Sequence, residues 1–226
     1  MKNRSTELWF FALLLGLANV PLLFGCVCEP LLFVPERVAS GEWWRVLTAS
    51  FVHVSSYHLL LDAGAFLLLY HSLREPSRIW RLLTVAVCAA GSFALAFFSL
   101  APDGSLCGLS GIGHGLLAVS ALEMTGAGDR ATARIGAACF IGVLAKGMFE
   151  AYTGEVLFAS LHLGDVATPV AVCHLGGVLG GIAVFVWRWV GGIGRCEVVE
   201  LIEVAEGIDC LDMTRQPRQP RLRANH

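Results

Sequence analysis

Apolar residues in this chain are gathered into six long runs. Runs of about 18 or more apolar residues predict membrane-spanning helices. Hydropathy places the runs near residues 8–25, 51–71, 79–100, 110–125, 131–149 and 168–190. The pattern therefore predicts an all-α membrane protein in which residues 1–190 form a six-transmembrane-helix bundle.

Two segments outside these runs, residues 27–50 and residues 191–226, are more polar than the runs themselves. Residues 27–50 contain Pro30, Pro35 and Trp43-Trp44-Arg45, and Trp is enriched at membrane interfaces. We expect this stretch to lie at the membrane surface. Residues 191–226 turn acidic and then basic, which predicts a cytoplasmic tail that is partly disordered. The first run is longer than the core of a signal peptide, about 7–15 residues, so we expect it to remain as a span.

Composition agrees with a membrane protein and excludes a nucleic-acid partner. Of 226 residues, 56% are hydrophobic and only 15% are charged, against about 25% charged in soluble domains. The net charge of -2 offers no basic field for nucleic acid. The eight cysteines show no zinc-type pairing. Whether Cys26, Cys28 or Cys107 form a disulfide stays open at this point.

The distribution of Lys and Arg predicts the orientation. Cytoplasmic segments carry the excess of these residues. With the N-terminus inside, only Arg37 and Arg45 of the 16 Lys and Arg residues fall outside, and Lys146 falls within the fifth run. Both termini are then cytoplasmic, and runs two, four and six lead inward. We expect an integral protein of the bacterial inner membrane with a site that opens outward.

Polar residues of the even-numbered runs fall at one depth. Ser110 and His174 each precede the inner end of their run by 14 residues, or ~21 Å of helix, and His58 by ~24 Å. Ionisable groups at such positions are costly and mark functional sites. Three separate spans therefore predict one polar site, sunk below the outer surface.

Serine hydrolysis is the chemistry that these residues suggest. A serine hydroxyl becomes a nucleophile when a neighbouring base takes its proton, which assigns Ser110 as nucleophile and His174 as base. Backbone N–H groups around the Gly108-Leu109 turn could stabilise an oxyanion. Gly111 on the fourth run, with Gly177 and Gly181 on the sixth, would let the two helices approach closely.

Neighbouring polar residues have supporting roles in this interpretation. His114 lies one turn below Ser110 on the same face and is expected to stack on His174 or to hydrogen-bond to it. His58 and Asp62, at i and i+4, share a face, and a histidine N–H there could complete an oxyanion hole. Lys146 and Glu150, also at i and i+4, are interpreted as a structural pair at the outer end of the fifth run.

Four ordered motifs resemble the rhomboid intramembrane proteases, over residues ~8–190. Gly108-Leu109-Ser110-Gly111 is similar to their GxSG motif, and His174 with Gly177 and Gly181 to their last catalytic helix. Trp44-Arg45 is similar to their WR loop. His53, His58 and Asp62 are similar to their HxxxxHxxxN segment.

The resemblance implies a six-span bundle with a Ser-His dyad and no third acidic member, metal or cofactor. Such enzymes cleave the transmembrane segment of a single-pass protein near the outer face of the bilayer. In the family, the residue matching His58 helps to bind the oxyanion.

Two positions depart from the common family pattern. Asp62 stands where most members have Asn, and an ionised carboxylate cannot donate a hydrogen bond. Asp62 is therefore either protonated or acts through His58.

His114 stands where many members have Tyr. The GLSGxxHG form and the compact chain resemble the rhombosortase subgroup, which is associated with removal of C-terminal GlyGly-type anchors from exported proteins.

Other function classes fit the sequence less well. A metalloprotease would need a motif such as HExxH, which is absent. An aspartyl intramembrane protease is suggested by Gly126-Ala127-Gly128-Asp129, but Asp129 and Asp62 belong to opposite ends of the bundle and cannot share a proton. A proton-linked transporter would show internal repeats. A catalytically silent binding protein would generally lack Ser110 or His174.

Overall fold

A computed structural model describes residues 2–157, 163–166 and 170–206, with side chains described from residue 4 to residue 191 of these ranges. The described residues are helical, and their one β-type contact is an isolated bridge between Phe33 and Leu106. The all-α prediction is thus confirmed for these ranges. The elements are α1 (Lys2–Ala18), η1 (Val20–Phe24), η2 (Glu29–Leu31), α2 (Pro35–Ala39), α3 (Trp44–Thr48), η3 (Ala49–Phe51), α4 (Ser56–Ser72), α5 (Arg78–Ser99), α6 (Ser110–Thr125), α7 (Arg130–Thr153) and α8 (Val172–Glu206).

Each apolar run holds a helix, but fewer than six of the described helices meet the length and composition of a full membrane span. Four do: Arg4–Phe24, Arg78–Ser99, Arg130–Thr153 and Val172–Gly191. A fifth span results if Trp44–Phe51 and Ser56–Ser72, which meet at 96°, are counted together. Helix α6 has 16 residues, or about 24 Å at 1.5 Å per residue, which is less than the ~30 Å hydrocarbon core.

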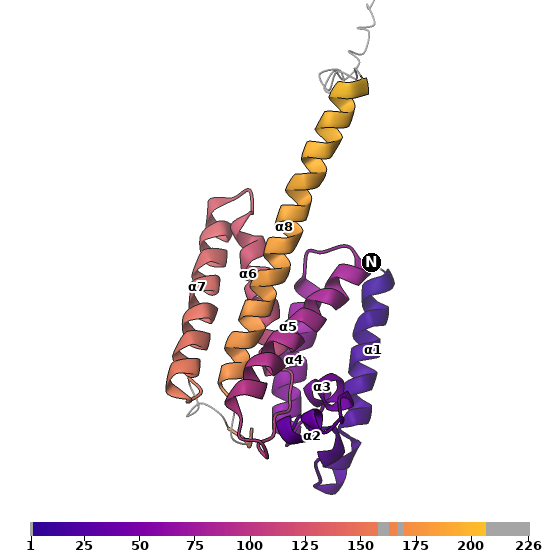
Figure 1. Ribbon diagram of the computed structural model, residues 1–226, viewed down its shortest axis with the longest axis vertical. Coiled ribbons are helices and arrows are strands. Elements are labelled where there is room, and N and C mark those ends of the chain that lie inside the picture. The colour runs from indigo at the N-terminus through magenta and orange to yellow at the C-terminus, as the bar shows by residue number, and fades with distance from the viewer. Residues whose placement is uncertain (1, 158–162, 167–169, 207–226) are drawn as a thin grey trace, which may run out of the picture. The chain divides into compact units, whose positions relative to one another are not determined.

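Helix α6 lies at the centre of the bundle. It contacts α4, α5 and α7, and its glycines meet α8, so it has helices on several sides (Figure 1). Its Leu116 and Val119 are fully buried in a core that includes Phe11 of α1 and Phe66 of α4. Ser110 and His114, the polar residues of its first turns, are accordingly half-buried and not exposed.

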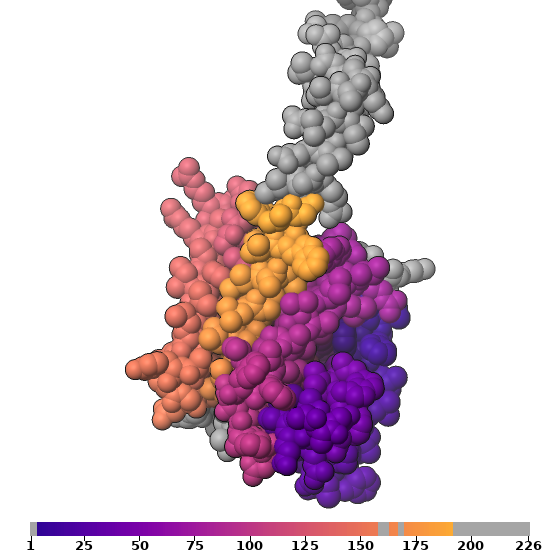
Figure 2. Space-filling model, in the orientation of Figure 1, coloured from indigo at the N-terminus to yellow at the C-terminus, as the bar shows by residue number. Residues whose placement is uncertain are grey.

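The segment expected at the membrane surface is built of short helices. Arg45, in the Trp44-Arg45 motif, donates from Nη1 to the carbonyl oxygens of Glu29 and Leu32, both at 2.8 Å, and its Nε lies 2.6 Å from Glu42. The buried guanidinium thus ties the turns of this segment together. Figure 2 shows residues 27–50 against α5, where Phe33 packs in a cluster with Phe93.

Ion pairs and caps fix the other helices. Buried Glu7 of α1 pairs with Arg81 of α5 at 2.7 Å and accepts a hydrogen bond from the Tyr70 hydroxyl of α4. Exposed Asp129 caps α7 by accepting the Thr132 N–H at 2.8 Å, and this hydrogen bond lowers the pKa of Asp129. A solvent-exposed helix cap is no partner for a buried catalytic carboxylate, which agrees with the rejection of an aspartyl protease.

The chain divides into two compact units, residues 1–185 and 186–226. The first holds every residue of the site. In the second, α8 continues as far as Glu206. The predicted start of the sixth span at residue 168 lies outside the described residues. Of the predicted tail, residues 191–226, the first part to residue 206 is described as helix α8 and the rest lies outside the described residues, so the cytoplasmic tail stays a prediction.

Candidate active site

Ser110 is the first residue of α6, at the end of a tight turn. Gly108 has a φ of 99°, a conformation that favours glycine. A Cβ at this position would also lie 2.8 Å from Asp62 Oδ2 and 2.9 Å from His58 Nε2. The turn therefore requires glycine for both conformation and space, and it presents Ser110 at the helix N-terminus.

His174 lies beside Ser110, as the depth estimate predicts. Its Nε2 is 3.0 Å from Ser110 Oγ, within hydrogen-bond distance. The histidine ring is buried, and Ser110 is half-buried. The distance permits transfer of the serine proton to the imidazole.

Glycines bring α6 and α8 together at this level. A Cβ on Gly177 would collide with the carbonyl oxygen of Gly111, and a Cβ on Gly181 would lie 2.5 Å from the carbonyl oxygen of Gly115. Either substitution would push the helices apart. The expected close approach of these two helices is thus present, and His174 stands three residues before Gly177 on the same face.

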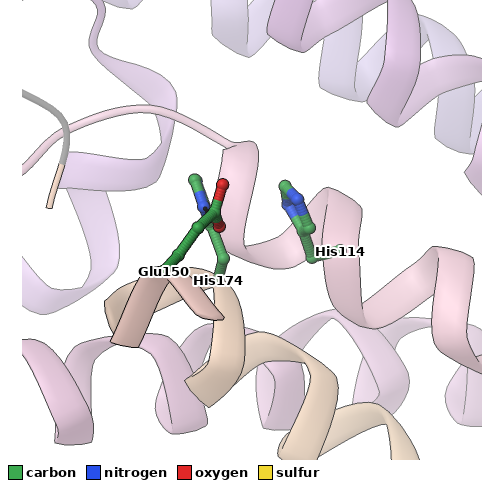
Figure 3. A group of neighbouring side chains, drawn as sticks. All are labelled: His114, Glu150 and His174. Atoms are coloured by element: carbon green, nitrogen blue, oxygen red, sulfur yellow. Dashed lines mark hydrogen bonds and ion pairs between the residues drawn. The ribbon is translucent and has the colours of Figure 1, made fainter. Parts of the chain in front are cut away.

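The opposite nitrogen of His174 contacts an acidic residue. His174 Nδ1 is 2.7 Å from Glu150 Oε2, and Glu150 is fully buried. Glu150 comes from the last turn of α7, and Figure 3 shows its carboxylate beside the His174 ring. The expected dyad has no acidic partner and the expected Lys146–Glu150 pair has no third member, whereas in the structure the Glu150 carboxylate contacts His174 as well as Lys146.

Lys146 joins Glu150 to the third residue drawn in Figure 3, His114. Lys146 Nζ is 2.5 Å from Glu150 Oε1 and 2.9 Å from His114 Nε2. His114 Nδ1 is in turn 2.7 Å from the Ser110 carbonyl oxygen. The His114 and His174 rings stack, with centroids 4.1 Å apart and an interplanar angle of 16°.

Asp62 anchors the other side of the turn. Its Oδ2 accepts the Leu109 N–H at 2.8 Å and lies 3.2 Å from His58 Nε2 and 3.5 Å from His53 Nε2. Asp62 is thus a hydrogen-bond acceptor in this arrangement. His53, which belongs to the same motif, is fully buried and meets the His58 ring edge-on at 4.9 Å.

Two of the expected oxyanion donors are already occupied. The Gly108 N–H donates to Ala49 O at 3.1 Å, and the Leu109 N–H donates to Asp62. The N–H groups of Ser110 and Gly111, in the first turn of α6, have no partner within the helix.

These residues line a cavity of about 1040 Å³. Ser110, His174, His58, Asp62, Lys146 and Glu150 all contribute to its wall, together with apolar residues such as Leu61 and Val170. A mostly apolar cavity with a few convergent polar groups is typical of a ligand site.

Three of the residues have the chemistry of metal ligands. The ligand atoms of His114, Glu150 and His174 lie within 4.8 Å of one another. However, the Lys146 ammonium already contacts His114 and Glu150, and a metal ion would have to displace this positive charge. The set therefore fits a hydrogen-bond network better than a metal centre.

The thiols of Cys26, Cys28 and Cys107, considered above for a disulfide, are free.

The sequence predicted neither the contact of Glu150 with His174 nor the complete burial of His53. The signal for Glu150 was its own burial problem, because a carboxylate at the end of an apolar run needs a polar partner. Lys146, on the same helix, is a sufficient local partner, so the sequence alone does not indicate the contact to His174, 24 residues further on.

The family model of the Rhomboid domain matches residues 40–190 of the chain, a range that contains every site residue. No curated protein and no solved structure matched the chain.

The α6–α8 contact generates a first prediction. Gly177→Ala should separate the two helices and lengthen the distance from Ser110 to His174, because the new methyl group has no room beside the Gly111 carbonyl. We expect at least a tenfold slower reaction of Ser110 with a fluorophosphonate in detergent. Gly142→Ala on α7, where a Cβ meets nothing within 4 Å, is the control. Equal rates for the two variants would show that the glycine contact does not set the site geometry.

Proposed function

Because this chain belongs to the rhomboid family of integral membrane proteins, we propose that it is an intramembrane serine endopeptidase. Ser110 is the nucleophile and His174 the general base. The observation that carries the proposal is the 3.0 Å separation of Ser110 Oγ and His174 Nε2 in the wall of a cavity. The family generally consists of serine intramembrane proteases that act on transmembrane substrates.

The reaction follows the general course of serine hydrolysis. Ser110 Oγ attacks the scissile carbonyl carbon while its proton passes to His174 Nε2. His174 then gives this proton to the leaving amine, and the acyl group stays on Ser110 Oγ. Water attacks the ester, loses a proton to His174, and releases the new carboxyl end of the substrate as the proton returns to Ser110.

The oxyanion is assigned to the first turn of α6 and to His58. The Ser110 and Gly111 N–H groups supply backbone donors at a helix N-terminus, where the helix dipole also favours negative charge. His58 lines the same cavity, and its Nδ1 has no partner among the described residues. His58 Nε2 faces Asp62, which leaves Nδ1 as the ring nitrogen that donates to the oxyanion.

Six crossings and a cytoplasmic N-terminus are part of the proposal. Helices α4 and α6 are counted as the two additional spans, short because their outer ends begin below the membrane surface. The Lys and Arg distribution supports this orientation, in which the cavity opens to the outer face. The proposed location is the bacterial inner membrane, with the C-terminal tail also in the cytoplasm.

We assign the chain to the rhombosortase subgroup, with C-terminal GlyGly-type anchors of single-pass exported proteins as substrates. The support is the GLSGxxHG sequence and His114, which stacks on His174 at the position where many rhomboids have Tyr. A small glycine pair at the cleavage site would also unwind readily, because glycine is a poor helix former.

The proposed function is tested with a panel of tagged transmembrane substrates, some of which end in GlyGly-type anchors. The wild-type protein should cleave, with preference for those anchors, and Ser110→Ala should not. Ser120→Ala is the matched control, because Ser120 lies on the same helix and its hydroxyl has no partner among the described residues. Equal cleavage by wild type and Ser110→Ala would exclude Ser110 as nucleophile.

Asp62 is tested by paired substitutions. Asp62→Asn keeps an oxygen that can accept the Leu109 N–H, so we expect cleavage within about tenfold of wild type. Asp62→Leu removes the acceptor and should abolish cleavage, because a buried N–H left without a partner costs about 1–3 kcal/mol and the turn before Ser110 is released. If Asp62→Asn is as inactive as Asp62→Leu, the charge on Asp62, acting through His58, is what the reaction requires.

A further inference from the structure

The contacts around His174 extend beyond the pair that the proposed function uses. A histidine base must keep an unprotonated Nε2 toward the serine, which requires the proton to sit on Nδ1. In this protein, the group facing Nδ1 is the carboxylate of Glu150, at 2.7 Å. A carboxylate only accepts, so His174 is held in the tautomer that serine activation needs.

Both oxygens of Glu150 are held in place. Oε2 faces His174, and Oε1 accepts from Lys146 Nζ at 2.5 Å and from the Leu157 N–H at 2.9 Å. Burial of an unpaired carboxylate is strongly unfavourable, and here Lys146 supplies the compensating charge. Glu150 is therefore fixed in rotation and remains able to accept from His174.

The donor and acceptor roles of Lys146 also fix the tautomer of His114. Lys146 has donors only, so His114 Nε2 must accept, and His114 Nδ1–H must donate to the Ser110 carbonyl oxygen. The contacts then form a closed ring. It runs from Ser110 through His114, Lys146, Glu150 and His174 back to Ser110. Each contact has one consistent direction: Lys146 only donates, Glu150 only accepts, and the other three members each donate once and accept once.

A purely structural Lys146–Glu150 pair would look different. A surface i,i+4 pair contributes little, whereas Glu150 is fully buried and its second carboxylate oxygen reaches His174 on another helix. When His174 takes the Ser110 proton, its positive charge develops directly beside the Glu150 carboxylate. The carboxylate thus both orients the imidazole and stabilises its charged form.

We propose that Glu150 is a positioning residue that completes a Ser110–His174–Glu150 triad, held by Lys146 and His114. This inference rests on the proposed function of Ser110 and His174. It differs from the Ser-His dyad that the family resemblance implies.

The test uses the full chain in detergent and compares wild type with Glu150→Gln and Glu150→Asp. In soluble serine proteases, the corresponding acid-to-amide change lowers kcat by about 10⁴-fold. We expect Glu150→Gln to lower kcat and the rate of fluorophosphonate reaction at Ser110 by at least 10²-fold, with KM within about twofold. Glu150→Asp should recover part of the lost rate. Glu155→Gln, an exposed residue just beyond α7, is the matched control.

A second measurement does not depend on activity. In ¹⁵N-histidine spectra of Ser110→Ala, which keeps the network but cannot react, His174 should show the Nδ1–H tautomer. In Ser110→Ala combined with Glu150→Gln, this preference should be lost.

The outcomes separate the two proposals. Wild-type kcat and labelling rate in Glu150→Gln would overturn the triad and leave the Ser110–His174 pair intact. A His174 tautomer unchanged by Glu150→Gln would also overturn it, even if that variant were too unstable for kinetics. A wild-type protein that neither cleaves nor labels, but shows the Glu150-dependent tautomer, would overturn the protease function and retain the positioning contact.

Discussion

The close contact between α6 and α8 is the constraint on which the rest of the site depends. Ser110 and His174 lie on separate helices, 64 residues apart, so the separation of the helices limits how closely the two side chains can approach. Gly177 faces the Gly111 backbone with no room for a side chain. In a membrane, where lipid is as apolar as the protein interior, such small-residue contacts are a main source of helix association. Glycine packing therefore stabilises the bundle and aligns the reacting pair together.

Around this contact, the polar groups form two separate sets. On one side, Ser110, His114, Lys146, Glu150 and His174 form a ring of hydrogen bonds. On the other side, Asp62 accepts from the turn before Ser110 and faces His53 and His58. Each set contains a carboxylate with cationic or potentially cationic partners, so neither leaves an isolated buried charge. In the proposed mechanism, the first set governs the serine proton, and the second shapes the turn and the oxyanion side.

Much of this could be predicted from the sequence because the decisive signals are local. Apolar runs located every long helix, and helix rise placed Ser110, His174 and His58 at one depth. Gly111 and Gly177 indicated the close approach of their helices. The number of full spans could not be predicted from the apolar runs, because a run does not show where its helix begins, and α4 and α6 are shorter than a full span.

The contact between Glu150 and His174 was out of reach for a different reason. It joins α7 to α8 across a loop whose course the sequence does not specify. Lys146, four residues before Glu150 on the same helix, already gives the carboxylate an ion-pair partner, so the sequence does not indicate a second one. Likewise, the direction of the Leu109 N–H depends on the left-handed turn at Gly108, which only the backbone conformation reveals. Contacts fixed by helix periodicity were predictable, whereas those fixed by helix rotation and loop path were not.

Serine hydrolysis by this chain requires that Ser110 be a nucleophile activated by His174. The most direct measurement is mass spectrometry of the chain after treatment with a fluorophosphonate in detergent. We expect a phosphonyl adduct on Ser110 in the wild-type protein and none in His174→Ala, with His71→Ala, at the exposed end of α4, labelled normally. An adduct on Ser110 that persists in His174→Ala would contradict the claim and direct attention to His114 as the base.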